Sequence, residues 1–130
     1  MHKHEFEKKV AEGFERLPEW IRKKINNVAL LIEDDPSDEL CEREGLSQDE
    51  TLLGYYHGIP LSARGDQYGV GPTMPDTITL FQNPIETAAE EDGMDVRDVI
   101  ADTIWHEYAH HFGMNEAEVR AWEEKRNGKK

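Results

Sequence analysis

The stretch GMDVRDVIADTIWHEYAHHFG, residues Gly93–Gly113, carries the strongest helical pattern in the chain. One face of the pattern holds residues at helical spacing: Val96, Val99, Ile100, Thr103 and Ile104. Asp95 is a suitable N-cap, and Gly113 can end the helix because glycine adopts positive φ without steric cost. The sequence therefore predicts one long helix that finishes in the octapeptide HEYAHHFG, residues His106–Gly113.

The octapeptide contains two histidines that are four residues apart. His106 and His110 are separated by about 40° around the helix axis and by about one turn along it. Two imidazoles so placed can direct nitrogens at one ion, at about 2.0–2.1 Å for zinc. Glu107 lies beside the first histidine, where its carboxylate can take a proton from a metal-bound water. This is the HExxH arrangement of zinc metalloproteases, and the competing interpretation is a chance match on an amphipathic helix.

A catalytic zinc usually has three protein ligands. His111 lies about 140° from His106 around the helix and cannot supply the third from there. Gly113 can reverse the chain, and Glu116 follows it by three residues, where HExxHxxGxxH enzymes carry a histidine. We predict Glu116 as the third ligand, with Glu118 in reserve. The alternative for Glu116 is an acid that stabilises the first turn of a following helix.

Two helices and a strand are predicted in the first third of the chain. Helical spacing relates four apolar residues, Phe6, Val10, Phe14 and Leu17. Pro18 opens a second short helix, PEWIRKKIN, with Trp20, Ile21 and Ile25 expected in the core. The run NVALLIED indicates a buried strand. The following SDELCEREG is ambiguous and is compatible with one or two helical turns.

The middle of the chain predicts two more strands around a long loop. LLGYYHG, Leu52–Gly58, is rich in aromatic residues, and TITLF, Thr77–Phe81, alternates β-branched and apolar residues. Between them, Ile59–Asp76 is rich in glycine and proline, which marks a loop. We expect TITLF near a cleft, where it could pair with an extended peptide if it is an edge strand. Short helices are expected from Pro84 to about Glu91 and from Asn115 to about Lys125.

A length of 130 residues suits one domain. From the expected helices and strands we predict an α+β fold over residues 1–130, in which a small mixed sheet packs on the His106 helix. The formal net charge of −13 argues against nucleic acid and anionic membranes as partners. Solubility explains this charge most simply, and a preference for basic peptides is the sharper interpretation. Cys41 is the only cysteine, and no signal peptide or membrane span is evident. We therefore expect a cytoplasmic protein.

Three stretches, LLGYYHGIPL, PDTITLFQNPIE and HEYAHHFGMNEAEV, resemble the bacterial zincin-like metallopeptidases of minimal, single-domain type. The resemblance covers roughly Leu52–Val119. It implies a few-stranded sheet on an active-site helix, zinc ligands at His106 and His110, Glu107 as the base, and an acidic third ligand at Glu116.

Larger enzymes with a similar motif carry a methionine turn beneath the metal, well downstream of the motif. None of the 14 residues after Glu116 is methionine, and Met114 is too close to serve. A core aromatic such as Trp122 is our candidate for this supporting role.

Several other residues are candidates for supporting roles. Asp102, one turn before His106, could accept the second N–H of that histidine, with solvation as the alternative. Tyr55, Tyr56 or His57 could donate to an oxyanion, although core packing is the simpler role for the tyrosines.

The predicted function is zinc-dependent hydrolysis of peptide bonds, in which Glu107 activates a zinc-bound water. The substrate would be a peptide or protein, and the sequence leaves room for a homodimer. The alternative is a non-catalytic metal-binding or regulatory module that retains the site.

Overall fold

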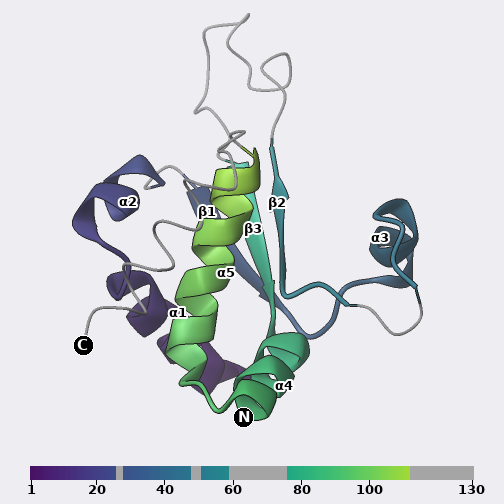
Figure 1. Cartoon of the computed structure of the whole chain (residues 1–130), viewed down its shortest axis with the longest axis horizontal. Helices are drawn as coiled ribbons and strands as arrows, with labels where there is room; N and C mark the ends of the chain where they lie inside the picture. Colours follow the sequence, from purple (N-terminus) through teal and green to yellow (C-terminus); the bar gives the residue numbers. More distant parts are fainter. Residues whose placement is uncertain (26–27, 48–50, 59–75, 112–130) are drawn as a thin grey trace, which may run out of the picture.

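A computed structural model describes residues 1–25, 28–47, 51–58 and 76–111. The helices and strands follow in this order: α1 (Lys3–Glu15), α2 (Glu19–Lys24), β1 (Val28–Glu33), α3 (Asp38–Arg43), β2 (Gly54–His57), β3 (Asp76–Phe81), α4 (Gln82–Asp92) and α5 (Val96–His111). The predicted α+β class is confirmed, with a small mixed sheet next to a long helix (Figure 1). The predicted loop before Asp76 and the predicted last helix lie outside the described residues.

The sheet has the strand order β1-β3-β2. Strand β3 runs parallel to β1 and antiparallel to β2. The stretch TITLF is therefore the central strand, and the option that it forms an edge is wrong. Its alternation explains the position, because Ile78 and Leu80 are fully buried on the face toward the helices, while Thr77 and Thr79 point the other way and are partly exposed.

Strand β1 is an edge strand in the described sheet and is less buried than its apolar run predicts. None of its residues is fully buried, and Leu31 is 45% exposed. An apolar run alone does not separate a central strand from an edge strand. Trp20 also departs from expectation, since it is 49% exposed. Its ring lies edge-on to that of Trp105, with 5.8 Å between the ring centroids.

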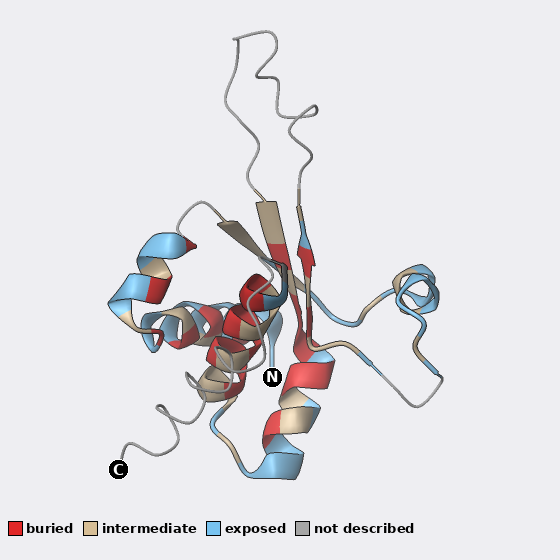
Figure 2. Cartoon of the chain, turned by 45° about the horizontal axis from the view of Figure 1, so that its top comes forward, coloured by how far each residue is buried: buried red, intermediate tan, exposed pale blue. Residues whose placement is uncertain are grey.

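Helix α5 crosses one face of the sheet and is buried on most of its circumference (Figure 2). Its buried side chains include Ile100, Ile104 and Trp105. Helix α1 packs along it so closely that a Cβ on Gly13 would lie 2.8 Å from the Arg97 carbonyl oxygen. Within the described ranges, no helix is long and apolar enough to cross a membrane.

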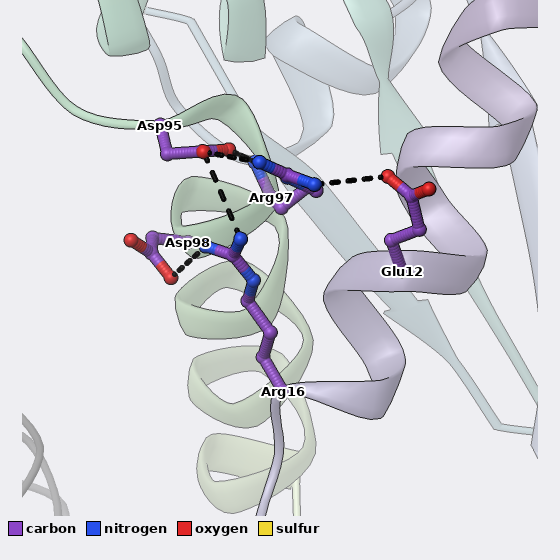
Figure 3. Close-up of polar contacts among 5 residues, drawn as sticks. All are labelled: Glu12, Arg16, Asp95, Arg97 and Asp98. Atoms are coloured by element: carbon purple, nitrogen blue, oxygen red, sulfur yellow. Dashed lines mark hydrogen bonds and ion pairs between the residues drawn. The ribbon is translucent and has the colours of Figure 1, made fainter.

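The start of α5 is fixed by the predicted N-cap and by a charged network (Figure 3). The Asp95 carboxylate accepts the backbone N–H of Arg97 at 2.8 Å, which confirms Asp95 as the cap. The same carboxylate pairs with the Arg97 guanidinium at 2.7 Å, and Arg97 reaches Glu12 of α1 at 3.3 Å. Arg16 pairs with Asp98 at 2.8 Å. These contacts join the end of α1 to the first turn of α5.

Candidate metal centre

Helix α5 presents its histidines on the side that its apolar residues leave open. Trp105, Tyr108 and Ala109 point into the core. His106 and His110 therefore lie together on another side, where His106 is half-buried and His110 is exposed. Their ring centroids are 5.1 Å apart with 46° between the ring planes. The structure thus brings the two predicted ligands side by side, one turn apart.

The predicted third ligand cannot be placed in this structure. Glu116 and its reserve Glu118 lie outside the described residues. In the part of the chain that is described, no third histidine, cysteine or acid joins the two histidines in a metal-binding group. The ligand set at His106, His110 and Glu116 therefore stays a prediction.

Glu107 is half-buried beside strand β2. Burial raises the pKa of the Glu107 carboxyl above its ordinary value of 4.5, and the charge of Glu44 acts in the same direction. A hydrogen bond from the Tyr56 backbone N–H and the nearby His110 lower the pKa in part. The net effect is a pKa raised above that of an exposed glutamate, which makes the Glu107 carboxylate a stronger base.

The hydrogen-bonding register explains why the Tyr56 amide reaches Glu107. Phe81 N–H donates to the Leu53 carbonyl at 3.0 Å, so residue 53 and every second residue after it hydrogen-bond to β3. The backbone groups of Gly54 and Tyr56 consequently point away from β3. Among the described strands, this side of β2 is the free edge of the sheet, and it runs beside Glu107.

The three β2 residues considered as oxyanion donors lie on opposite faces of the sheet. Tyr56 is buried, and its hydroxyl donates to Asp76 at 2.6 Å. Tyr55 and His57 alternate to the opposite face of the sheet, where Arg43 lies 5.9 Å from the Tyr55 ring centroid. Tyr56 therefore packs in the core as the simpler interpretation held, and Tyr55 and His57 do not face the histidine helix.

A pocket of about 360 Å³ opens beside His106 and Glu107. Its lining comes from the segment before and at the start of β2, from the second half of α4, from the connection between α4 and α5, and from α5: Thr51, Leu52, Leu53, Gly54, Ala88, Asp92, Met94, Val99, Asp102, Thr103, His106 and Glu107. Asp102, considered above as a partner for His106, is half-buried in this lining. The candidate ligand His106 and the candidate base Glu107 therefore line the same pocket.

Comparison with known proteins places the chain in a family. The model of the family described as zincin-like metallopeptidase matches residues 25–126, most of the chain. The chain belongs to the zincin-like metallopeptidase family. Among solved structures, the fold of this zincin-like protein is similar to that of a conserved hypothetical protein from Thermo thermophilus, with a TM-score of 0.53, 23% identity and coverage of 85% of this chain and 94% of that chain. That likeness concerns the fold alone. No curated protein matches the chain.

The donors of this zincin-like domain fit a zinc ion. Imidazoles are common zinc ligands, and the two histidines lie on one side of α5 with their ring centroids 5.1 Å apart. A carboxylate with a raised pKa stands next to them. The family assignment and this donor chemistry agree on a metallopeptidase-type site.

Sequence reasoning missed the contribution of Gly54. A Cβ at this position would lie 2.7 Å from Thr103 Cγ2 and 3.6 Å from Glu107 Cγ. Glycine inside a predicted strand often marks a close approach of another backbone or side chain, and this was the available signal.

Proposed function

We propose that this zincin-like protein is a zinc-dependent peptidase. One observation carries the proposal: the two histidines of α5 lie side by side, and the neighbouring Glu107 faces the free edge of β2. His106 and His110 would hold the metal, together with Glu116. The arrangement combines a metal-binding pair, a base and a strand edge within one small region.

Zinc, when bound, supplies a Lewis acid that polarises the scissile carbonyl and makes a nearby water more acidic. Glu107 takes the proton of the attacking water and then delivers it to the departing amine. Burial raises the pKa of this carboxyl, which makes it a stronger base than an exposed glutamate. The Tyr56 N–H holds the carboxylate in place through a backbone hydrogen bond.

Strand β2 offers a means of aligning a peptide. The Tyr56 N–H is already bonded to Glu107, but the Tyr56 carbonyl and the backbone groups of Gly54 also point outward. These groups match those of an extended chain, so a peptide can add to the sheet as a further strand. Main-chain pairing of this kind is largely independent of side chains. It favours an extended peptide or unstructured protein segment as the substrate class.

Digestion of a peptide library tests the proposal. The zinc-loaded wild type is expected to cut peptides, and Glu107→Gln is expected to keep its zinc and lose about 10²–10⁴-fold in rate. His110→Ala serves as the control that loses the metal. If wild type and Glu107→Gln both hold zinc and neither cuts, the protein is a metal-binding module without catalysis. If the wild type holds no zinc, a regulatory role is favoured.

A further inference from the structure

We propose that the pocket beside Glu107 binds a lysine or arginine side chain of the substrate, adjacent to the cleaved bond. The proposal rests on the proposed peptidase function and adds to it a substrate class. It is carried by the shape of the pocket, by the nature of its walls and by the placement of its charges.

The walls suit an aliphatic stem. Five of the twelve lining residues are apolar, and they come from the segment before β2, from α4, from the connection between α4 and α5, and from α5: Leu52, Leu53, Ala88, Met94 and Val99. The methylenes of lysine and arginine pack well on such surfaces while the charged end seeks a polar partner. An aliphatic wall alone would also accept methionine or leucine, so the charges decide between these.

The charged residues of the lining are mostly acidic. Asp92 and Asp102 lie in the pocket with Glu107, whereas no lysine or arginine is among its described lining residues. Asp102 is half-buried, so its attraction for a cation is less screened by water than that of an exposed carboxylate. An acidic substrate residue would meet charges of its own sign, and a neutral one would gain no attraction from the carboxylates.

The distances match the length of a basic side chain. Asp102 precedes Glu107 by five residues, which is about 7.5 Å along the helix. An extended lysine spans five bonds from Cα to Nζ, about 6 Å, and a hydrogen bond from Nζ to a carboxylate oxygen adds about 2.8 Å. A lysine that enters beside Glu107 therefore brings its cationic end within hydrogen-bonding reach of the level of Asp102. Asp92, at the end of α4, is available to the longer arginine.

The test uses blocked peptides that differ at one position only, with lysine, arginine, methionine or glutamate there. Binding is measured by calorimetry on zinc-loaded Glu107→Gln, which separates recognition from turnover. We expect lysine and arginine peptides to bind about tenfold more tightly than methionine peptides, and glutamate peptides to bind weakest. Equal or tighter binding of the methionine peptides would overturn the proposal.

Variants of Asp92 and Asp102 test which carboxylate produces the preference for basic peptides. In the Glu107→Gln background, Asp102→Asn is expected to reduce the preference for lysine to less than about threefold, and Asp92→Lys to weaken lysine binding and improve glutamate binding. Glu91→Gln is the matched control, because Glu91 is exposed, neighbours Asp92 and does not line the pocket. A preference that survives both acid variants, or that disappears in the control, contradicts the assignment. Asp92 is exposed on the helix end, so its variant is expected to fold even if Asp102→Asn does not.

The wild type separates this inference from the proposed function. Cuts next to lysine or arginine support both. Cuts without such a preference leave the peptidase in place and remove the specificity pocket. Selective binding of basic peptides without any cleavage would contradict the proposed peptidase activity and support a pocket that recognises basic peptides.

Discussion

Gly54 of β2 lies directly on Thr103 of α5, so closely that a Cβ on the glycine would stand 2.7 Å from Thr103 Cγ2. Real Cβ atoms do not approach other atoms this closely. The contact determines how closely β2 packs against α5, one helical turn before Glu107. It therefore fixes the distance between the strand edge and the candidate base, and it makes a glycine necessary at a point where the sequence otherwise predicts a strand residue.

We predict that Gly54→Ala weakens both the fold and the site. The methyl group meets Thr103 and also the Thr79 carbonyl oxygen at 3.1 Å, so β2 has to move outward. Overpacking of this kind costs about 1–3 kcal/mol. Urea unfolding measures the stability, and peptide turnover well below the melting temperature measures the site. A variant with unchanged stability would show that β2 does not sit on α5 as described.

Gly13→Ala is the control for this experiment. A Cβ there would lie 2.8 Å from the Arg97 carbonyl oxygen and 2.9 Å from Ile100 Cγ2, in the contact between α1 and α5. A comparable loss of stability is expected, but with turnover preserved in the folded protein, because neither contact touches the pocket. Equal losses of turnover in both variants would mean that the effect of Gly54→Ala comes from stability alone.

Glu107 is predicted to reduce the stability of the metal-free protein near neutral pH. Its pKa is raised in the folded state, so the fold binds the proton more tightly than the unfolded chain does. Stability contributed by the protonated carboxyl is present below the unfolded pKa, near 4.5, and is lost as pH rises through the folded pKa. Glu107→Gln should therefore melt at the same or a higher temperature at about pH 7. Glu90→Gln is the control at an exposed position and should leave the melting temperature unchanged. A clear drop in melting temperature for Glu107→Gln alone would show that burial of the charged Glu107 carboxylate does not destabilise the fold.

The hydroxyl of Tyr56 is predicted to stabilise the sheet beneath the site. Tyr56→Phe removes the 2.6 Å hydrogen bond to Asp76 at the first residue of β3. The expected loss is about 1 kcal/mol, measured by chemical unfolding. Tyr55→Phe is the matched change on the opposite face and is expected to be near neutral. If Tyr55→Phe costs as much as Tyr56→Phe, the hydrogen bond to Asp76 is not the cause.

Asp95 is predicted to make the protein sensitive to acid. Its hydrogen bonds with the Arg97 side chain and backbone, aided by the charges of Arg97 and Arg16, hold the pKa of Asp95 far below its usual 3.8. A lowered folded pKa contributes stability that is present above about 3.8 and is lost as pH falls toward the folded value.

Two substitutions at Asp95 separate the charge from the helix cap. Asp95→Asn keeps a side-chain oxygen that can cap the helix but loses the charge. Asp95→Ala loses both, and the loss of the cap is expected to cost about 1 kcal/mol of folding stability. Thermal unfolding against pH should show that the gap between wild type and Asp95→Asn narrows in acid. A gap independent of pH would indicate that the ion pair contributes nothing, as exposed pairs often do.

The sequence predicted most of the elements because local signals agree with the fold. Asp95 caps α5 as expected, and the alternation of Ile78 and Leu80 with threonines predicted β3 correctly. The order of the strands was beyond local signals, because pairing depends on contacts between distant segments. Leu31 shows the same limit, since its neighbours predict burial while its place on an edge strand leaves it 45% exposed.

The candidate site could likewise be predicted only in part from the sequence. Residues four apart lie on the same side of a helix, so the sequence could predict that the rings of His106 and His110 lie side by side. The pocket could not be predicted, because Leu53, Asp92 and Asp102 are brought together from three segments. The raised pKa of Glu107 likewise arises from burial against β2, which only the tertiary structure determines.

Zinc titration of the metal-free protein tests the central claim, that His106 and His110 hold one metal ion beside Glu107. Calorimetry on wild type and on Glu107→Gln is expected to give one zinc per chain with similar affinity, whereas His106→Ala and His110→Ala should each weaken binding by at least about tenfold. Unchanged zinc affinity in both histidine variants would contradict the account.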